Sequence, residues 1–147
     1  MKGFLVDTNV ISEWAKPRPS AKVTDFIFQS ERHQLFTCTA SFAGIRQGAE
    51  SAASFELRNR LLKWLENDLR PFFLHRVLEI TEDIVLAALN LIVSSSRKRQ
   101  PVHLADSLIA GVAYVHGLVV VTRNTKDFTP LRVPALNPWT GERFNGA

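Results

Sequence analysis

Cysteine is nearly absent from the chain, and long apolar runs are absent altogether. Cys38 is the only cysteine among 147 residues, so no disulfide can form within the chain, which suits the reducing cytoplasm. Cys38 lies in an apolar run, which favours a buried small side chain over a nucleophile. No run reaches the roughly 18 apolar residues of a membrane span, and the run before Asp7 is too short for a signal peptide. We therefore expect a cytoplasmic protein with no membrane segment.

Several common catalytic motifs are also missing. The chain has no GxSxG motif, no P-loop and no GxGxxG fingerprint, which argues against a serine hydrolase, a P-loop NTPase and a dinucleotide-binding enzyme. The histidines are widely spaced, with no interval typical of metal ligands: His33, His75, His103 and His116. A zinc site built from histidine and cysteine is therefore not expected.

The composition is that of one globular domain with a surplus of positive charge. Hydrophobic residues make up 46% of the chain and charged residues 22%, and 147 residues are enough to bury a core. Lys and Arg number 18 against 14 Asp and Glu, which gives a net charge of +4. We expect a single domain over 1–147, and its charge permits an anionic partner such as nucleic acid without requiring one.

Short apolar runs alternate with segments of helical periodicity. The apolar runs predict strands at 3–6, 34–40, 75–81 and 118–122. Apolar residues at helical spacing predict helices at 8–16, 21–31, 41–50, 51–69, 82–98 and 104–117. This order is typical of an α/β fold with three layers (α/β/α), in which helices flank a central parallel sheet.

Helix ends and connections can also be assigned from residue type. Ser41 and Thr81 are candidate N-caps, and Gly117 is a candidate helix stop. The basic segment 94–101 is a candidate loop, and a short tail at 131–139 is expected to end the fold.

Acidic and amide side chains follow two of the predicted strands. Asp7 comes directly after strand 3–6, and Asn124 and Asp127 follow strand 118–122. Asp106 lies in the first turn of the helix that leads into that last strand. Ligands of open parallel sheets bind outside the carboxyl ends of the strands. We therefore expect these side chains to meet at one edge of the sheet.

Crowded carboxylates repel one another unless a cation lies between them. Oxygen ligands without nearby Cys or His suit Mg²⁺ or Mn²⁺, and such a site can activate water at a phosphodiester. Each acid also has a purely structural interpretation: Asp7 as a helix cap, Asp106 as a helix-dipole acid, and Asp127 as a turn residue. The nuclease hypothesis therefore rests on their joint placement.

Three segments together resemble the PIN-domain family: FLVDTNVISE at 4–13, ADSLIAGVAYVHGLVVVTRNTKDF at 105–128 and LNPW at 136–139. More narrowly, the whole chain resembles the VapC (FitB-like) ribonuclease toxins of bacterial type II toxin–antitoxin systems. The resemblance implies a flanked parallel sheet, Mg²⁺ or Mn²⁺ in a cluster of acids, and hydrolysis of RNA in the bacterial cytoplasm. It also implies a homodimer and a cognate VapB-type antitoxin.

The family's site residues can be carried over by position. Asp7 matches the first acid, and Asp106 matches the acid of the helix before the last strand. Asn124 takes a position that many members fill with Asp, and Asp127 is a second candidate for that carboxylate. Two further residues match positions that line the site, Asn9 and Thr122.

The chain departs from the family at Gly44. Aligned on IRQG at 45–48, Gly44 takes the position of a metal-site glutamate. Glu50 is a poor substitute, because six residues further along a helix it lies about 120° around the axis and about 9 Å along it. We expect an intact site to hydrolyse RNA with metal-activated water, and this chain to be weakened or inactive.

Three alternatives remain open at this point. The chain could be a catalytically dead PIN module that binds RNA or antitoxin, which Gly44 favours. It could be a phosphatase or other hydrolase of another α/β fold, but that class usually has a second Asp two residues after the first, where this chain has Asn9. It could also be a housekeeping PIN nuclease without an antitoxin.

Overall fold

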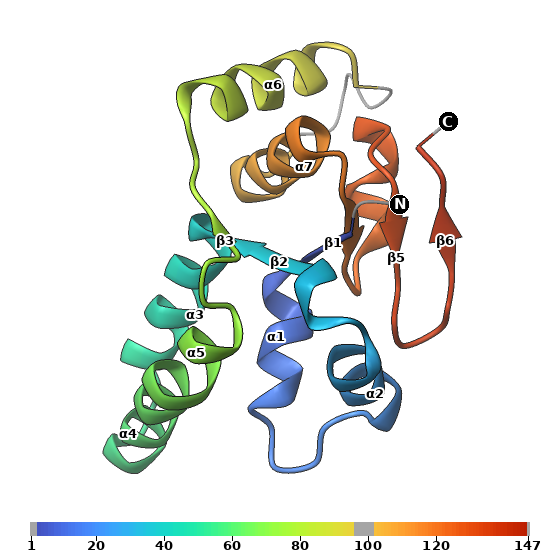
Figure 1. Ribbon diagram of the computed structural model, residues 1–147. Coiled ribbons are helices and arrows are strands. Elements are labelled where there is room, and N and C mark those ends of the chain that lie inside the picture. Colours follow the sequence, from blue (N-terminus) through green and yellow to red (C-terminus); the bar gives the residue numbers. More distant parts are fainter. Residues whose placement is uncertain (1–2, 96–101, 147) are drawn as a thin grey trace.

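A six-stranded sheet is the frame of the computed structural model, which describes residues 3–95 and 102–146 (Figure 1). Its strand order is β3-β2-β1-β4-β5-β6. All neighbouring strands pair in parallel except β6, which is antiparallel to β5. The strands are β1 Phe4–Val6, β2 Leu35–Cys38, β3 Val77–Leu78, β4 Val119–Val121, β5 Ala135–Leu136 and β6 Arg143–Phe144. The predicted central parallel sheet is confirmed.

Helices cover both faces of this sheet. They are α1 Thr8–Trp14, α2 Ala21–Gln29, α3 Thr39–Glu50, α4 Phe55–Trp64, α5 Arg70–Phe72, α6 Glu82–Val93 and α7 Leu104–His116. The pair α6 and α7 lies on one face, and α1 and α2 lie on the other with α3, α4 and α5 beside them (Figure 1). This arrangement confirms the predicted three layers. Within the described ranges, no helix combines the length and apolar character needed to cross a membrane.

The central strand β1 divides the core between the two faces. Phe4 and Val6 pack in one buried cluster with Val10 of α1, whereas Leu5 packs in the other with Ile109 of α7. Alternate side chains of a strand point to opposite faces, and both faces of β1 are covered. This is why β1 reads as a continuous apolar run in the sequence.

Two predicted helix ends are confirmed and one is wrong. The Thr81 hydroxyl accepts the Ile84 N–H at 3.3 Å at the start of α6. Gly117 ends α7 in the left-handed conformation, with φ of 66°. Ser41 is not an N-cap, because α3 begins at Thr39 directly after β2 and Ser41 is buried inside its first turn. Gly44 therefore lies in the second turn of α3.

Other element boundaries also differ from the sequence predictions. Strand 75–81 shortens to β3, Val77–Leu78. The predicted helix 51–69 begins only at Phe55, where the Ser54 hydroxyl accepts the Leu57 N–H at 3.1 Å, and it continues as a π-helix, η2, over Leu65–Leu69. The remaining short helices are 3₁₀ turns: η1 Arg32–Gln34, η3 Thr125–Asp127 and η4 Thr129–Leu131.

The C-terminal part extends the sheet further than the sequence indicated. The segment 131–139, expected to be only a short tail, contains β5, and β6 follows it. Each of these strands has two residues, too few to display a period-two pattern. Of the predicted basic loop 94–101, residues 96–101 lie outside the described part of the chain.

Candidate active site

The candidate site lies where β1 and β4 end side by side. The chain leaves β1 toward β2 on one side and later returns to pair β4 on the other, with Val6 opposite Val121. Open α/β sheets bind ligands at such a change of direction, outside the carboxyl ends of the strands. Asp7 and Thr122 are the next residues of these two strands, so the topology brings them together.

Asp7 is buried and fixed through both carboxylate oxygens. Its Oδ1 accepts the Thr8 N–H at 2.7 Å, and its Oδ2 accepts the Thr122 hydroxyl at 2.8 Å. The side chain thus caps α1 while it remains at the sheet edge. Burial raises the pKa of Asp7, the hydrogen bonds from Thr122 and Thr8 oppose that rise, and the charge of Asp127 adds to it.

Thr122 connects Asp7 to the loop after β4. The fully buried Thr122 Oγ1 accepts the Asn124 N–H at 3.1 Å and the Asn9 side-chain N–H at 3.4 Å. Asn9 Oδ1 accepts the Arg123 N–H at 3.1 Å. Asn9 and Thr122 therefore lie beside Asp7, where they orient its carboxylate and the following loop.

Asp106 and Asp127 lie within electrostatic reach of Asp7. Asp106 occupies the first turn of α7, and Asp127 ends η3. Burial, followed by the charges of Asp127 and Asp7, raises the pKa of Asp106 to about 6, and His103 opposes that rise. Three carboxylates from distant parts of the chain thus share one electrostatic environment.

Gly44 contributes no side chain, but it faces the same region. A Cβ atom added at Gly44 would lie 3.8 Å from Thr8 Cγ2 and 3.9 Å from Thr8 Oγ1, which are ordinary contact distances. A Cβ atom at this position would therefore pack against Thr8, the residue that follows Asp7, without a clash.

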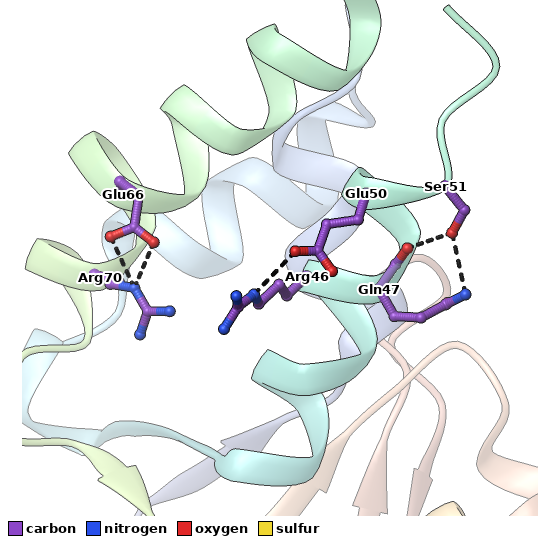
Figure 2. A network of polar contacts seen from close by, with 6 residues as sticks. All are labelled: Arg46, Gln47, Glu50, Ser51, Glu66 and Arg70. Atoms are coloured by element: carbon purple, nitrogen blue, oxygen red, sulfur yellow. Dashed lines mark hydrogen bonds and ion pairs between the residues drawn. The ribbon is translucent and has the colours of Figure 1, made fainter. Parts of the chain in front are cut away.

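Glu50 does not supply the carboxylate that is missing at position 44. Figure 2 shows the Glu50 carboxylate turned toward Arg46 of the same helix, and the two groups pair at 3.2 Å. Both side chains are more than half exposed, at 53% and 62%. Glu50 therefore pairs with Arg46 in solvent and does not point toward the candidate site, in agreement with the sequence argument.

The residues present do not form a complete metal site. Asp7, Asp106 and Asp127 offer the hard oxygen donors that Mg²⁺ and Mn²⁺ prefer. However, no group of three or more His, Cys, Asp or Glu side chains in the described ranges 3–95 and 102–146 is arranged to hold a metal ion. The donor chemistry fits such a cation, but the number and placement of the donors fall short.

Sequence reasoning overlooked a second set of contacts next to this edge. The Arg123 guanidinium lies over the Trp139 ring, 4.8 Å from its centroid. Asn137 joins the two segments, because its Nδ2 donates to the Arg123 carbonyl at 3.3 Å and its Oδ1 accepts the Trp139 N–H at 2.8 Å. The available signal was that the TRNTKDF and LNPW segments both belong to the stretches that resemble the PIN-domain family.

Known proteins are similar to this chain over almost their whole length and most of its own. The plasmid stability protein StbB of Pseudomonas syringae pv. tomato is 33% identical over 92% of this chain and 98% of its own. The VapC ribonuclease Y4jK of Sinorhizobium fredii is 29% identical over 92% of this chain and 97% of its own.

Solved structures give the same result. FitAcB from Neisseria gonorrhoeae matches with a TM-score of 0.87 and 28% identity, over 93% of this chain and 99% of the other. DNA-bound VapBC from Salmonella typhimurium matches with a TM-score of 0.70 and 26% identity, over 87% and 91% of the two chains. In addition, the model of the PIN domain family matches residues 4–131, which include every candidate site residue. The chain therefore belongs to the PIN-domain family.

Proposed function

We propose that this chain is the toxin of a VapBC-type toxin–antitoxin pair, built as a metal-dependent endoribonuclease but lacking one carboxylate of its site. Its relatives include a VapC ribonuclease, and chains of the same fold have been solved as FitAcB and as DNA-bound VapBC. The matches extend over almost the whole chain, so the proposal concerns the entire domain. Its partners would be RNA and a VapB-type antitoxin.

The observation that supports this proposal is that three carboxylates lie within electrostatic reach of one another, with Asp7 at the ends of β1 and β4. Asp7, Asp106 and Asp127 come from three separate segments, and the charges of Asp7 and Asp127 both act on Asp106. Such crowding of acids costs free energy in the absence of a cation, so it argues for a functional origin.

The proposed cofactor is Mg²⁺, which Mn²⁺ can replace. Asp7, Asp106 and Asp127 would hold it once a carboxylate at position 44 completes the set, with Asn124 as a neighbouring oxygen donor. When bound, a divalent cation neutralises the charge at a phosphodiester and activates water. Thr122 and Thr8 hold both Asp7 oxygens in fixed positions, and the burial of Asp7 restricts competition from bulk water.

Because Gly44 supplies no carboxylate, we expect this chain to have weak ribonuclease activity. Gly44 faces Thr8 from α3, where a carboxylate would complete the acidic cluster from the side that now has none. The second candidate function, a PIN module that binds antitoxin or RNA without cleaving it, is favoured by the same observation.

A homodimer is part of the proposal. Apolar side chains on α6 and α7 are exposed, namely Leu86 at 55%, Leu89 at 52%, Val93 at 78% and Tyr114 at 66%. An apolar face of this kind is suited to burial against a second copy. Sedimentation of the purified chain and of Leu89→Lys tests this part of the proposal: the parent is expected as a dimer and the variant as a monomer.

RNA cleavage with Mg²⁺ or Mn²⁺ tests the proposed function. The chain as it stands is compared with Gly44→Glu and with Gly44→Glu/Asp7→Asn on a broad set of RNAs. Cleavage by Gly44→Glu alone supports a PIN ribonuclease with a vacant ligand position. If all three proteins bind metal but none cleaves, the binding module becomes the better description. Asp7-dependent cleavage by the unsubstituted chain would contradict the role given to Gly44.

A further inference from the structure

A polar pocket adjoins Asp127 on the surface of the domain. Its volume is about 480 Å³, within the range of sites that bind small ligands. One wall is the segment after β4, and the other is the turn between β5 and β6. Its lining includes Asn124, Lys126, Asp127, Asn137, Thr140 and Glu142. The pocket therefore shares a carboxylate with the candidate active site.

The two walls of the pocket are tied together by side chains. Asn137 bonds to the backbone of both Arg123 and Trp139, and the Thr125 hydroxyl donates to Glu142 Oε1 at 2.9 Å. The Arg123 guanidinium also lies over the Trp139 ring. These contacts connect the loop after β4 to the β5–β6 turn, so the two walls of the pocket are held together without a ligand.

Three polar groups in the pocket have unused binding capacity. Within residues 3–95 and 102–146, the Lys126 ammonium forms no ion pair and the Asn124 carboxamide forms no hydrogen bond. Glu142 Oε1 accepts from Thr125, and no hydrogen bond from the described part of the chain occupies Oε2. A cation suits a phosphate, and an amide and a carboxylate suit the edge of a base.

We infer that this pocket binds one nucleotide of the RNA substrate, adjacent to the phosphate at the acidic cluster. Lys126 contacts the phosphate of that nucleotide, while the Asn124 side-chain NH₂ group and the Glu142 carboxylate contact its base. Cytosine presents an exocyclic amine that can donate to the Glu142 carboxylate, whereas uracil presents a carbonyl oxygen at that position, so Glu142 favours cytosine over uracil. This inference rests on the proposed function, because it assigns a substrate subsite to that same reaction.

Binding of short single-stranded RNA tests the pocket separately from cleavage. Labelled oligocytidine and oligouridine of about 12 nucleotides are titrated with the chain in Mg²⁺, at salt from about 50 to 200 mM. The pocket variants are Lys126→Gln and Glu142→Gln. The matched controls are Lys63→Gln and Glu56→Gln, which change the same residue types at exposed positions on α4.

The two pocket variants should have different effects. Lys126→Gln should weaken the binding of both RNAs about threefold to fivefold and reduce the slope of log affinity against log salt by about 0.7. Glu142→Gln should reduce the preference for oligocytidine over oligouridine at least about fivefold. Both controls should bind like the parent.

Two contrary results have different meanings. If RNA binds but the pocket variants match their controls, the pocket is not a nucleotide subsite, and the proposed function is unaffected. If no form of the protein binds or cleaves RNA, Gly44→Glu included, the proposed function fails and this inference fails with it.

Discussion

The substitution Gly44→Glu should tighten the binding of Mn²⁺ without disturbing the fold. A new Cβ atom would lie 3.8 Å from its nearest neighbour, the Thr8 methyl group, so no steric cost is expected. Replacing Gly inside a helix stabilises it by about 0.5–1 kcal/mol. In the absence of metal, repulsion between the new carboxylate and the existing ones should cost about 1 kcal/mol, which cancels this gain. The metal-free melting temperature should therefore change by no more than about 3 °C.

With metal present, the substitution should have a clear effect. If one added carboxylate tightens binding about tenfold to a hundredfold, saturating Mn²⁺ adds about 1.4–2.7 kcal/mol of stability. For a domain of this size, that raises the melting temperature by about 3–10 °C beyond the Mn²⁺ effect on the parent. Thermal unfolding with and without Mn²⁺ measures this difference.

The matched control for this prediction is Gly44→Gln. It restores helix propensity and side-chain volume but supplies no negative charge. An equal Mn²⁺ shift in Gly44→Gln and Gly44→Glu would refute the reasoning, because a gain in packing would then explain the result. No additional shift in either variant would refute it as well.

Three other substitutions test the surrounding contacts. Thr122→Val should destabilise the protein by about 1–3 kcal/mol in urea unfolding, because the buried Asp7 carboxylate loses a hydrogen-bond donor. Thr122→Ser should retain most of the stability. If Thr122→Val does not change the free energy of unfolding, the hydrogen-bond network is contradicted. The raised pKa of Asp106, about 6 against 3.8, means that its ionised form opposes folding above about pH 6 and that this penalty disappears as the pH falls toward 3.8. Without metal, Asp106→Asn should therefore increase the free energy of unfolding by about 1 kcal/mol at pH 8, a figure reduced from about 3 for solvent screening, and by almost nothing at pH 4. An equal increase at both pH values would show that ionisation of Asp106 is not its cause. Glu50→Gln should leave Mn²⁺ binding unchanged and cost at most about 0.5 kcal/mol, because Glu50 pairs with Arg46 in solvent, and a loss of metal affinity would place Glu50 in the site.

The sequence was most informative where side chains repeat a clear pattern. Continuous apolar runs predicted β1 and β4, and the order of elements predicted a parallel sheet. From these two strands alone, Asp7 and the loop after β4 could be placed at one edge. Thr81 and Gly117 were also assigned correctly, because capping depends on the chemistry of a single residue.

Features that depend on tertiary contacts were not accessible from the sequence. Ser41 has the chemistry of a cap, but β2 passes into α3 two residues earlier. The short strands β5 and β6 form because neighbouring backbone supplies their hydrogen bonds, and they contain too few residues for a pattern. The Asn137 contacts and the pocket beside Asp127 likewise arise only when two distant loops meet.

The most direct test of the central claim, that Gly44 is a vacant ligand position in a PIN-domain metal site, is the anomalous diffraction of Mn²⁺. Crystals of Gly44→Glu and of the parent chain would be soaked in MnCl₂ under the same conditions. The account predicts a strong peak in Gly44→Glu at bonding distance from Asp7 and the introduced carboxylate, and a weak or absent peak in the parent. A peak of equal strength at Asp7 in both crystals, or no peak at Asp7 in Gly44→Glu, would contradict it.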